Sequence, residues 1–365
     1  MPMAHRILIT GAAGYIGTML CDRMSERSDV ESIIGVDLKP MPEALRSNPK
    51  LIWIIGNTAE PAWQVAAGAA RPDIVVHTAW RIREPYGPAN SSNIAGSDAV
   101  FDFAFAAPSV KKLIHFSTVA SYGARADNSI AQRFTEEAPF RPTDFGYAEE
   151  KRIAEQHLEQ RFAESDKTKQ VAVLRPAAVT GPRGRSRASL FGLQSALNGS
   201  FKGSPVARLV TLLMNLIPVT PQWCRQFVHE DDLSAVVLML AFGTLLSAYS
   251  RFNVSPPDEP MTAREVAAAF QKRLIKVHPY LIRLAFLLAW HGTRGRIPTA
   301  RGVWRSYSYP LAVDGSALTR AYGYQYQYGT KDAFTKNVGH YATMSAMPYA
   351  GAPEMPDLNG IKTAL

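Results

Sequence analysis

The chain has 365 residues, of which 47% are hydrophobic and 19% are charged. These values are ordinary for a soluble globular protein and exclude a disordered chain, and the length suits about two domains or one large domain with a cap. Forty basic against 31 acidic side chains give a net charge of +9. Since no nucleic-acid-binding motif accompanies this charge, it favours an anionic substrate or an anionic membrane surface.

Cysteine usage and apolar segments limit the location of the protein. The two cysteines, Cys21 and Cys224, offer neither a disulfide framework nor a metal site, so we expect a reducing cytoplasm. The apolar run at residues 7–9 is short and leads directly into a glycine-rich turn, so we expect no signal peptide. Residues 205–219 and 279–290 are apolar, but each is shorter than the roughly 20 residues of a spanning helix. We interpret both as cap helices, and contact with a membrane surface or with an apolar substrate stays open.

Short apolar runs alternate with helix-compatible segments through the first half of the chain. This alternation predicts an α/β fold, a Rossmann-type doubly wound parallel sheet with helices on both faces. The predicted strands cover residues 6–10, 32–37, 51–55, 73–77, 111–117 and 170–175, and the clearest helices cover 15–28, 93–107 and 144–164.

The pattern changes after residue 181, where a basic loop and longer apolar segments begin. Residues 226–232 introduce another helix, whose first turn is acidic as the helix dipole favours. We predict a dinucleotide-binding domain over residues 1–182, to which 225–255 return. Residues 183–224 and 256–343 then form a smaller, mostly helical substrate-binding cap, and 344–365 form a tail.

A glycine-rich turn follows the first predicted strand. Gly11, Gly14 and Gly17 have the spacing of a dinucleotide-binding fingerprint, in which glycines allow a tight turn and close approach to a pyrophosphate. Asp37 ends the second strand, where a carboxylate can accept both ribose hydroxyls and repels a 2′-phosphate. The cofactor predicted is therefore NAD rather than NADP, although Lys39 would weaken the repulsion.

Tyr147 and Lys151 are four residues apart on a predicted helix and hence share one face. A tyrosine hydroxyl is a poor base at neutral pH, and lowering its pKa by about three units takes roughly 4 kcal/mol. A nearby lysine ammonium and an oxidised nicotinamide can supply that stabilisation. We predict that Tyr147 exchanges the proton of an alcohol or carbonyl oxygen while Lys151 binds the nicotinamide ribose.

Ser117 and Thr118 end the fifth predicted strand, at the edge where open α/β sheets bind ligands. Their hydroxyls can bind the substrate oxygen, although strand-end hydroxyls also occur as ordinary turn residues.

These residues together resemble the extended short-chain dehydrogenase/reductase group, the NAD-dependent epimerase/dehydratase family, from about Arg6 to Tyr341. The resemblance assigns catalysis to Thr118, Tyr147 and Lys151. It also matches the turn His77-Thr78-Ala79-Trp80, in which Trp80 is an unusually bulky variant. The cofactor-binding residues expected from motif and resemblance are Gly11, Ala13, Gly14, Tyr15, Ile16, Gly17, Asp37, Asn57, Thr58, Thr78, Ala79, Asn93, Ser117, Tyr147, Lys151 and Pro176.

Departures from the family's pattern narrow the substrate. Val119 and Ala120 stand where dehydratases have an Asp-Glu pair, and they cannot transfer protons. Ala178 replaces an asparagine of nucleotide-sugar epimerases, whereas Arg225 matches an arginine that grips a substrate pyrophosphate. The Pro-Ala pair at the end of the sixth predicted strand and the apolar cap instead resemble the branch of 3β-hydroxysteroid dehydrogenases and related carbonyl reductases. The expected substrate contacts are Ser117, Thr118, Ala178, Arg183 and Arg225, with Arg185 and Arg187 beside Arg183.

The sequence therefore predicts an NAD-dependent oxidoreductase that transfers hydride at a secondary alcohol or ketone of a hydrophobic, sterol-like or lipid-like substrate. A nucleotide-sugar epimerase and a non-catalytic NAD-sensing protein are the alternatives. By analogy with the family, we expect a homodimer formed through the helices at 93–107 and 144–164.

Overall fold

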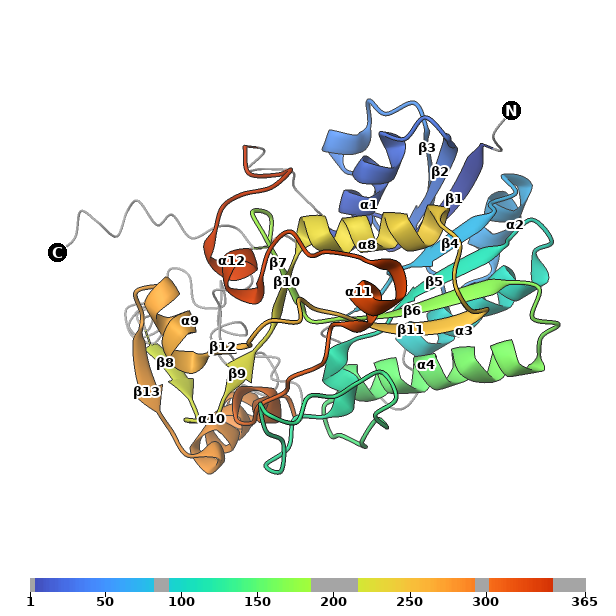
Figure 1. Ribbon diagram of the computed structural model, residues 1–365. Helices are drawn as coiled ribbons and strands as arrows, with labels where there is room; N and C mark the ends of the chain where they lie inside the picture. The colour runs from blue at the N-terminus through green and yellow to red at the C-terminus, as the bar shows by residue number, and fades with distance from the viewer. Residues whose placement is uncertain (1–3, 82–91, 185–215, 293–301, 344–365) are drawn as a thin grey trace.

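A seven-stranded parallel sheet forms the centre of the molecule (Figure 1). The structure, a computed structural model, describes residues 4–81, 92–184, 216–292 and 302–343. The strand order reverses between β1 and β4, and such a switch point is where open α/β sheets bind ligands. In spatial order the strands are β11 (Tyr249–Val254), β6 (Gln170–Pro176), β5 (Lys112–Phe116), β4 (Ile74–His77), β1 (His5–Thr10), β2 (Val30–Asp37) and β3 (Leu51–Ile55).

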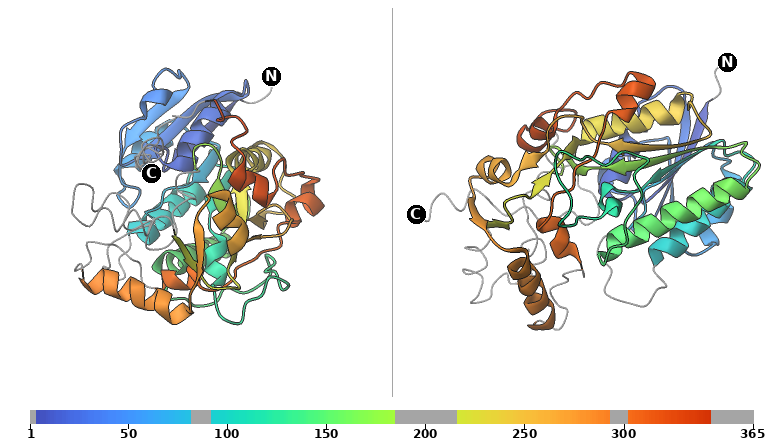
Figure 2. Two further views of the ribbon diagram at one scale, coloured as in Figure 1. Left: turned by 90° about the vertical axis from the view of Figure 1, so that its left-hand side faces the viewer. Right: turned by 60° about the horizontal axis from the view of Figure 1, so that its bottom comes forward.

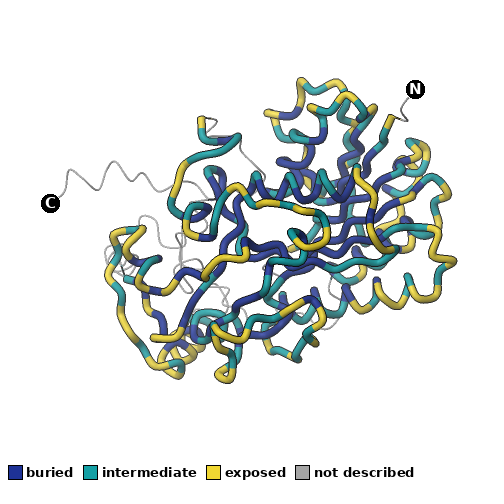
Figure 3. Tube along the Cα trace, in the orientation of Figure 1, coloured by how far each residue is buried: buried dark blue, intermediate teal, exposed yellow. Residues whose placement is uncertain are grey.

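Helices cover both faces of this sheet because side chains along each strand alternate in direction (Figure 1). On β1, Ile7 and Ile9 pack into one buried cluster and Leu8 into another. The first cluster includes α1 (Tyr15–Ser25), α8 (Glu230–Phe242) and α11 (Ala317–Tyr322). The second includes α2 (Ala62–Ala69), α3 (Ser92–Ala106) and α4 (Gly146–Glu164). Figure 3 shows how burial concentrates in the central strands.

A smaller part lies beyond the carboxyl edge of the sheet and has its own apolar cluster, which includes Trp223, Phe227 and Phe334. Short strand pairs build it, rather than helices alone. They are β7 (Ala178–Thr180) with β10 (Phe227–His229), β8 (Leu216–Val219) with β13 (Arg273–Lys276), and β9 (Cys224–Arg225) with β12 (Met261–Thr262). The remaining elements are η1 (Glu43–Leu45), η2 (Val119–Tyr122), α9 (Ala263–Ala269), α10 (Pro279–Gly292), η3 (Val303–Tyr307) and α12 (Thr330–Thr335).

The six predicted strands and three predicted helices are present, with ends that differ by a few residues. The sheet has a seventh strand, β11, that the sequence did not predict because its polar residues interrupt the apolar pattern. The interpretation of 205–219 as a helix is wrong for residues 216–219, which form β8. Pro218 within that run lacks the N–H that a helix interior needs. Residues 205–215, the basic loop from 185 onward and the tail 344–365 lie outside the described residues.

The segment 279–290 is helical as predicted and lies in α10. Within the described ranges, no helix combines the length and apolar character that crossing a membrane requires.

Candidate active site

The turn between β1 and α1 leaves no room for side chains at two of its glycines. Gly11 has φ +72°, and a Cβ there would lie 2.6 Å from the Ala79 Cα. A Cβ on Gly17 would lie 2.1 Å from the Gly11 carbonyl oxygen. Gly14 caps helix α1 and offers no side chain to the N–H groups of the first helical turn. These N–H groups and the positive end of the helix dipole therefore point outward. This arrangement fits a dinucleotide pyrophosphate.

Strand β2, which pairs with β1, supplies a carboxylate at its end. One Asp37 oxygen accepts a hydrogen bond from the Ala13 N–H and the other from the Lys39 N–H, each at 3.0 Å. These two amides fix the carboxylate at the end of β2, the position from which ribose hydroxyls are bound in this type of fold.

Two further expected adenosine contacts follow β3. The Asn57 Oδ1 accepts from the Ala59 N–H at 3.2 Å, and its amide donates to Glu60 at 3.2 Å. The Thr58 hydroxyl lies against α3, where a Cβ on Gly96 would come within 2.4 Å of it. Asn57 and Thr58 therefore lie in a tightly packed segment next to the end of β2.

The residues that follow β4 border the site on the other side of the switch point. The Thr78 hydroxyl donates to the Thr10 carbonyl at 2.7 Å. Asn93 on α3 donates to the Arg81 carbonyl at 3.0 Å and to the Glu150 carboxylate at 2.8 Å, and accepts from the Arg81 N–H at 2.8 Å. Asn93 therefore holds the segment that carries Trp80 next to α4, a positioning role that the sequence did not indicate.

Trp80 contacts both residues of the predicted catalytic pair. Its ring is 3.6 Å from the Lys151 Nζ and, edge-on, 6.4 Å from the Tyr147 ring, both measured to the ring centroids. The Tyr147 ring also lies 5.7 Å from that of Phe145. The structure thus brings tyrosine, lysine and an indole together at the start of α4. The bulky variant at position 80 was noticed in the sequence, but its contact with Lys151 was not predicted.

Lys151 is 3% exposed, and its ammonium donates to the Phe116 carbonyl. Burial holds the pKa of Lys151 well below its ordinary value, and the carboxylates of Glu155 and Glu150 act in the opposite direction. The carbonyl and the Trp80 ring both favour the charged form. A lysine in this environment is characteristic of a functional site.

The hydroxyl residues after β5 lie at the same edge. Thr118 caps the 3-10 turn η2, where its Oγ1 accepts from the Ala120 N–H at 3.2 Å. Ser117 is 4% exposed, and among the described residues its Oγ has no hydrogen-bond partner. A buried hydroxyl of this kind fits a site that is completed by a ligand. The Ser121 hydroxyl donates to the Ala148 carbonyl at 3.0 Å and ties this turn to α4.

A buried ion pair joins α4 to β6 of the central sheet. Arg175 on β6 pairs with Glu155, and both side chains are nearly inaccessible. Its guanidinium also donates to the Tyr122 hydroxyl at 2.7 Å and to the Glu136 carbonyl at 3.0 Å. Glu155 follows Lys151 by one helical turn, so the pair fixes the helix that carries the catalytic residues. The i, i+4 spacing of Lys151 and Glu155 was the available sequence signal.

The expected substrate contacts are spread over two places. Pro176 is buried at the end of β6, and Ala178 begins β7 directly after it. Arg225 lies on β9 in the smaller part, with its guanidinium 5.4 Å from the Trp223 ring centroid and 5.3 Å from that of Tyr307. Aromatic contacts therefore orient Arg225.

Arg183, one of the expected substrate contacts, is buried against α1. Its side chain is 2% exposed and lies at the start of α1, where it donates to the Thr18 hydroxyl at 2.5 Å. Its backbone N–H donates to Glu230 at 3.0 Å, and Glu230 also accepts from the Tyr15 hydroxyl at 2.8 Å. Arg183 and Tyr15 thus anchor α1 to α8. Arg185 and Arg187 lie outside the described residues.

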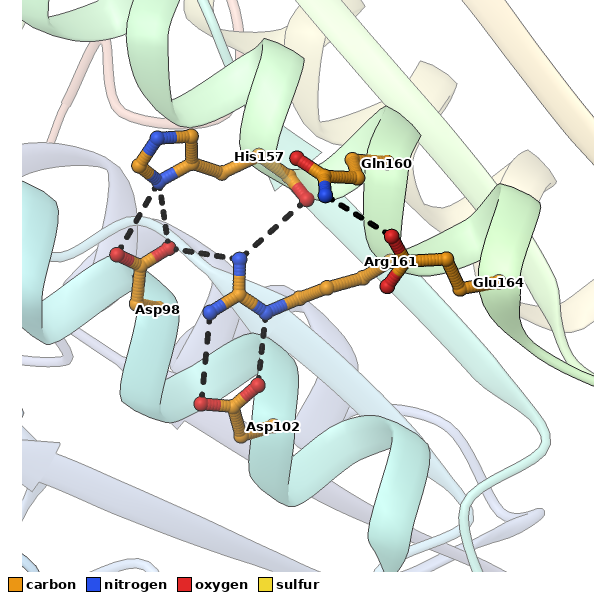
Figure 4. A pocket seen from close by; sticks show the side chains of 6 residues that line it. All are labelled: Asp98, Asp102, His157, Gln160, Arg161 and Glu164. Carbon is orange, nitrogen blue, oxygen red and sulfur yellow. Dashed lines mark hydrogen bonds and ion pairs between the residues drawn. The ribbon is translucent and has the colours of Figure 1, made fainter.

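A polar hollow on the outer side of α3 and α4 lies apart from these groups (Figure 4). Arg161 pairs there with Asp98 at 3.0 Å and Asp102 at 2.7 Å, and His157 lies 3.0 Å from Asp98. These charges satisfy one another, and we assign no chemistry to the hollow. The residues that line it are Asp98, Asp102, His157, Gln160, Arg161 and Glu164.

The glycine turn, the carboxylate after β2 and the tyrosine–lysine pair at the switch point define a Rossmann-type enzyme of the short-chain dehydrogenase/reductase kind. The chain belongs to the NAD dependent epimerase/dehydratase family, whose model matches residues 7–254. This membership confirms the resemblance found in the sequence, NAD as the cofactor, and an NAD-dependent oxidoreductase or epimerase as the class of enzyme.

One relative of this chain is a reductase. A 2-alkyl-3-oxoalkanoate reductase from Stenotrophomonas maltophilia is 29% identical over 184 residues, which are 48% of this chain and 52% of the relative. The chain thus matches about half the length of that protein.

Solved structures support the fold. WbmG from Bordetella bronchiseptica, in complex with NAD and UDP, is 22% identical with a TM-score of 0.63, over 94% of this chain and 95% of that one. UDP-glucose 4-epimerase from Thermotoga maritima, with UDP-glucose, is 18% identical with a TM-score of 0.64, over 90% and 96%. At these identities the likeness shows the fold and leaves the reaction to be argued from the site.

Proposed function

We propose that this protein oxidises a secondary alcohol or reduces a ketone on a largely apolar substrate. The observation that carries the proposal is the Tyr147 ring beside Trp80 and Lys151, at the sheet edge where the glycine turn would hold the cofactor. Bound NAD would supply the hydride acceptor, or NADH the donor.

Each residue has a distinct part in this reaction. The Tyr147 hydroxyl exchanges a proton with the substrate oxygen. Lys151 in its ammonium form stabilises the phenolate and binds a ribose hydroxyl, and the Phe116 carbonyl and the Trp80 ring hold it in place. The Thr118 and Ser117 hydroxyls donate to the same substrate oxygen and hold the reacting carbon toward the cofactor. The cofactor itself would be held by backbone N–H groups of the glycine turn and by the Asp37 carboxylate.

Several features support an apolar ketone or alcohol rather than a sugar. Val119 and Ala120 in η2 carry no group that could perform the acid–base steps of dehydration. Ala178 offers no amide to a nucleotide phosphate. The Stenotrophomonas relative is a 2-alkyl-3-oxoalkanoate reductase. Arg225, oriented by Trp223 and Tyr307, would bind such an anionic end.

A nucleotide-sugar epimerase is the second candidate, because Arg225 would equally suit a pyrophosphate and the solved relatives include an enzyme with bound UDP. Bound NADH would then return the hydride to the same sugar carbon, while Tyr147 exchanges the proton and Lys151 holds the ribose. In either case we propose that 1–182 with 225–255 bind the cofactor and that 183–224 with 256–343 bind the substrate. We further propose a cytoplasmic homodimer formed through α3 and α4.

The experiment offers deuterated NADH with alkyl ketones, 3-oxo acids, sterols and UDP-sugars. An oxidoreductase transfers deuterium into the released product, whereas an epimerase keeps the hydride on its bound cofactor and releases unlabelled product. Tyr147→Phe should lower turnover by about 100-fold or more and leave NAD affinity nearly unchanged. Tyr280→Phe, at an exposed tyrosine of α10, is the matched control. Wild-type turnover by Tyr147→Phe would refute the assignment.

A further inference from the structure

Helix α10 presents an apolar face to solvent. Leu281 is 57% exposed and Leu288 63%, and Leu284 lies on the same side between them. The spacing of three and four residues aligns them in one stripe. The opposite side of the helix holds it in place, because Ile282 and Phe286 are buried against Trp304. The stripe is therefore an extra apolar face on a helix that is already anchored. Tyr280 and Leu287 are also exposed large apolar side chains of α10.

The chain around this helix carries only positive charge. Residues 266–313 contain eight lysines and arginines and no aspartate or glutamate. In the structure, Arg273 and Lys276 are exposed on β13, directly before α10, and Arg283 is exposed within it. Cations beside exposed leucines complement a surface that is apolar beneath and anionic at its boundary.

The length of α10 excludes that it spans a membrane, and its position suits a helix that lies on a membrane surface. It has 14 residues, fewer than the roughly 20 that cross a bilayer. It lies along the outer edge of the molecule, away from the central sheet (Figure 2). A helix in that place can lie flat on a surface with its leucines among the acyl chains and its cations at the headgroups.

We propose that α10 docks this protein on an anionic lipid surface. The leucine stripe inserts at the boundary between headgroups and acyl chains, and Arg273, Lys276 and Arg283 bind lipid phosphates. This inference is independent of the proposed reaction, since it concerns binding to lipid in the absence of substrate.

The test measures co-sedimentation of the full-length protein with vesicles of phosphatidylcholine alone and with vesicles of about one-third phosphatidylglycerol, whose headgroup supplies the negative surface charge. We expect binding to the anionic vesicles only, weakening as salt is raised. Leu284→Gln/Leu288→Gln should reduce the partition coefficient about tenfold or more, and Arg273→Gln/Lys276→Gln about fivefold per charge removed. Leu246→Gln, at a leucine 69% exposed outside α10, is the matched control and should bind like wild type.

Three results would overturn the proposal. Equal binding by Leu284→Gln/Leu288→Gln and wild type would show that α10 does not make the contact. A wild-type oligomer in light scattering that dissociates on this double substitution would assign the stripe to a second copy. A fall of several degrees in the unfolding temperature of the same variant would show that the chain itself covers the stripe, because exposed substitutions alter stability little.

Discussion

Removing one partner of the buried Arg175–Glu155 pair, which fixes α4, is expected to destabilise the protein strongly. Glu155→Leu removes the carboxylate and leaves the guanidinium of Arg175 buried, with only the Tyr122 hydroxyl and the Glu136 carbonyl as acceptors. Burial opposes the charge on Arg175, yet Glu155 more than offsets it, so the pKa of Arg175 is above its ordinary value. Breaking such a pair costs about 3–5 kcal/mol, which corresponds to a fall of about 10 °C in the unfolding temperature.

The assay is thermal and urea unfolding of a double-mutant cycle, with NAD affinity measured alongside. Arg175→Met/Glu155→Leu should recover most of the loss, because no charge then remains buried. Glu159→Leu is the matched control on the same helix. Its partner is Arg251 at 3.5 Å and its side chain is 55% exposed, so we expect a change within about 0.5 kcal/mol. A Glu155→Leu variant as stable as the control, or a double variant less stable than either single one, would refute the reasoning.

Three other predictions concern the site and its surroundings. Trp80→Leu removes the ring that favours the ammonium, so the pKa of Lys151 should fall further and move the alkaline limb of kcat/KM to lower pH; an unchanged limb would count against the contact. Burial lowers the pKa of His77 to about 3. Its contribution is present above pH 6.5 and is lost as the pH falls toward 3, so in urea unfolding the wild type should lose about 2 kcal/mol more stability between pH 7 and pH 5 than His77→Gln does. Burial lowers the pKa of His115 as well, which adds to the decline of both proteins. Asp37→Ser should raise NADP affinity relative to NAD by about tenfold or more, since a carboxylate repels the 2′-phosphate, and equal ratios by calorimetry would contradict this.

The parts of the fold that depend on local pattern were predictable from the sequence. The glycine turn follows from the steric requirements at Gly11 and Gly17 alone. The apolar runs that alternate with helical segments define β1 to β6. Strand β11 was not predictable, because its polar residues are stabilised by pairing with β6 and by contacts with α11, which come from distant parts of the chain.

The same distinction holds for the site. Tyr147 and Lys151 share a helix face, so their proximity follows from spacing alone. The contact between Trp80 and Lys151 joins residues 71 positions apart, and the burial of Arg183 depends on Thr18 and Tyr341. No local sequence pattern reports long-range packing of this kind.

The anchoring of α1 has a consequence for how the protein reaches its native state. Tyr341 is fully buried, donates to Asp22 of α1 at 2.8 Å, and packs against Arg183. These partners are separated by 319 positions, so the helix that begins the nucleotide turn gains its last support from almost the opposite end of the described chain. We therefore expect coenzyme affinity to develop in a slow, late phase of refolding, after most of the secondary structure has formed.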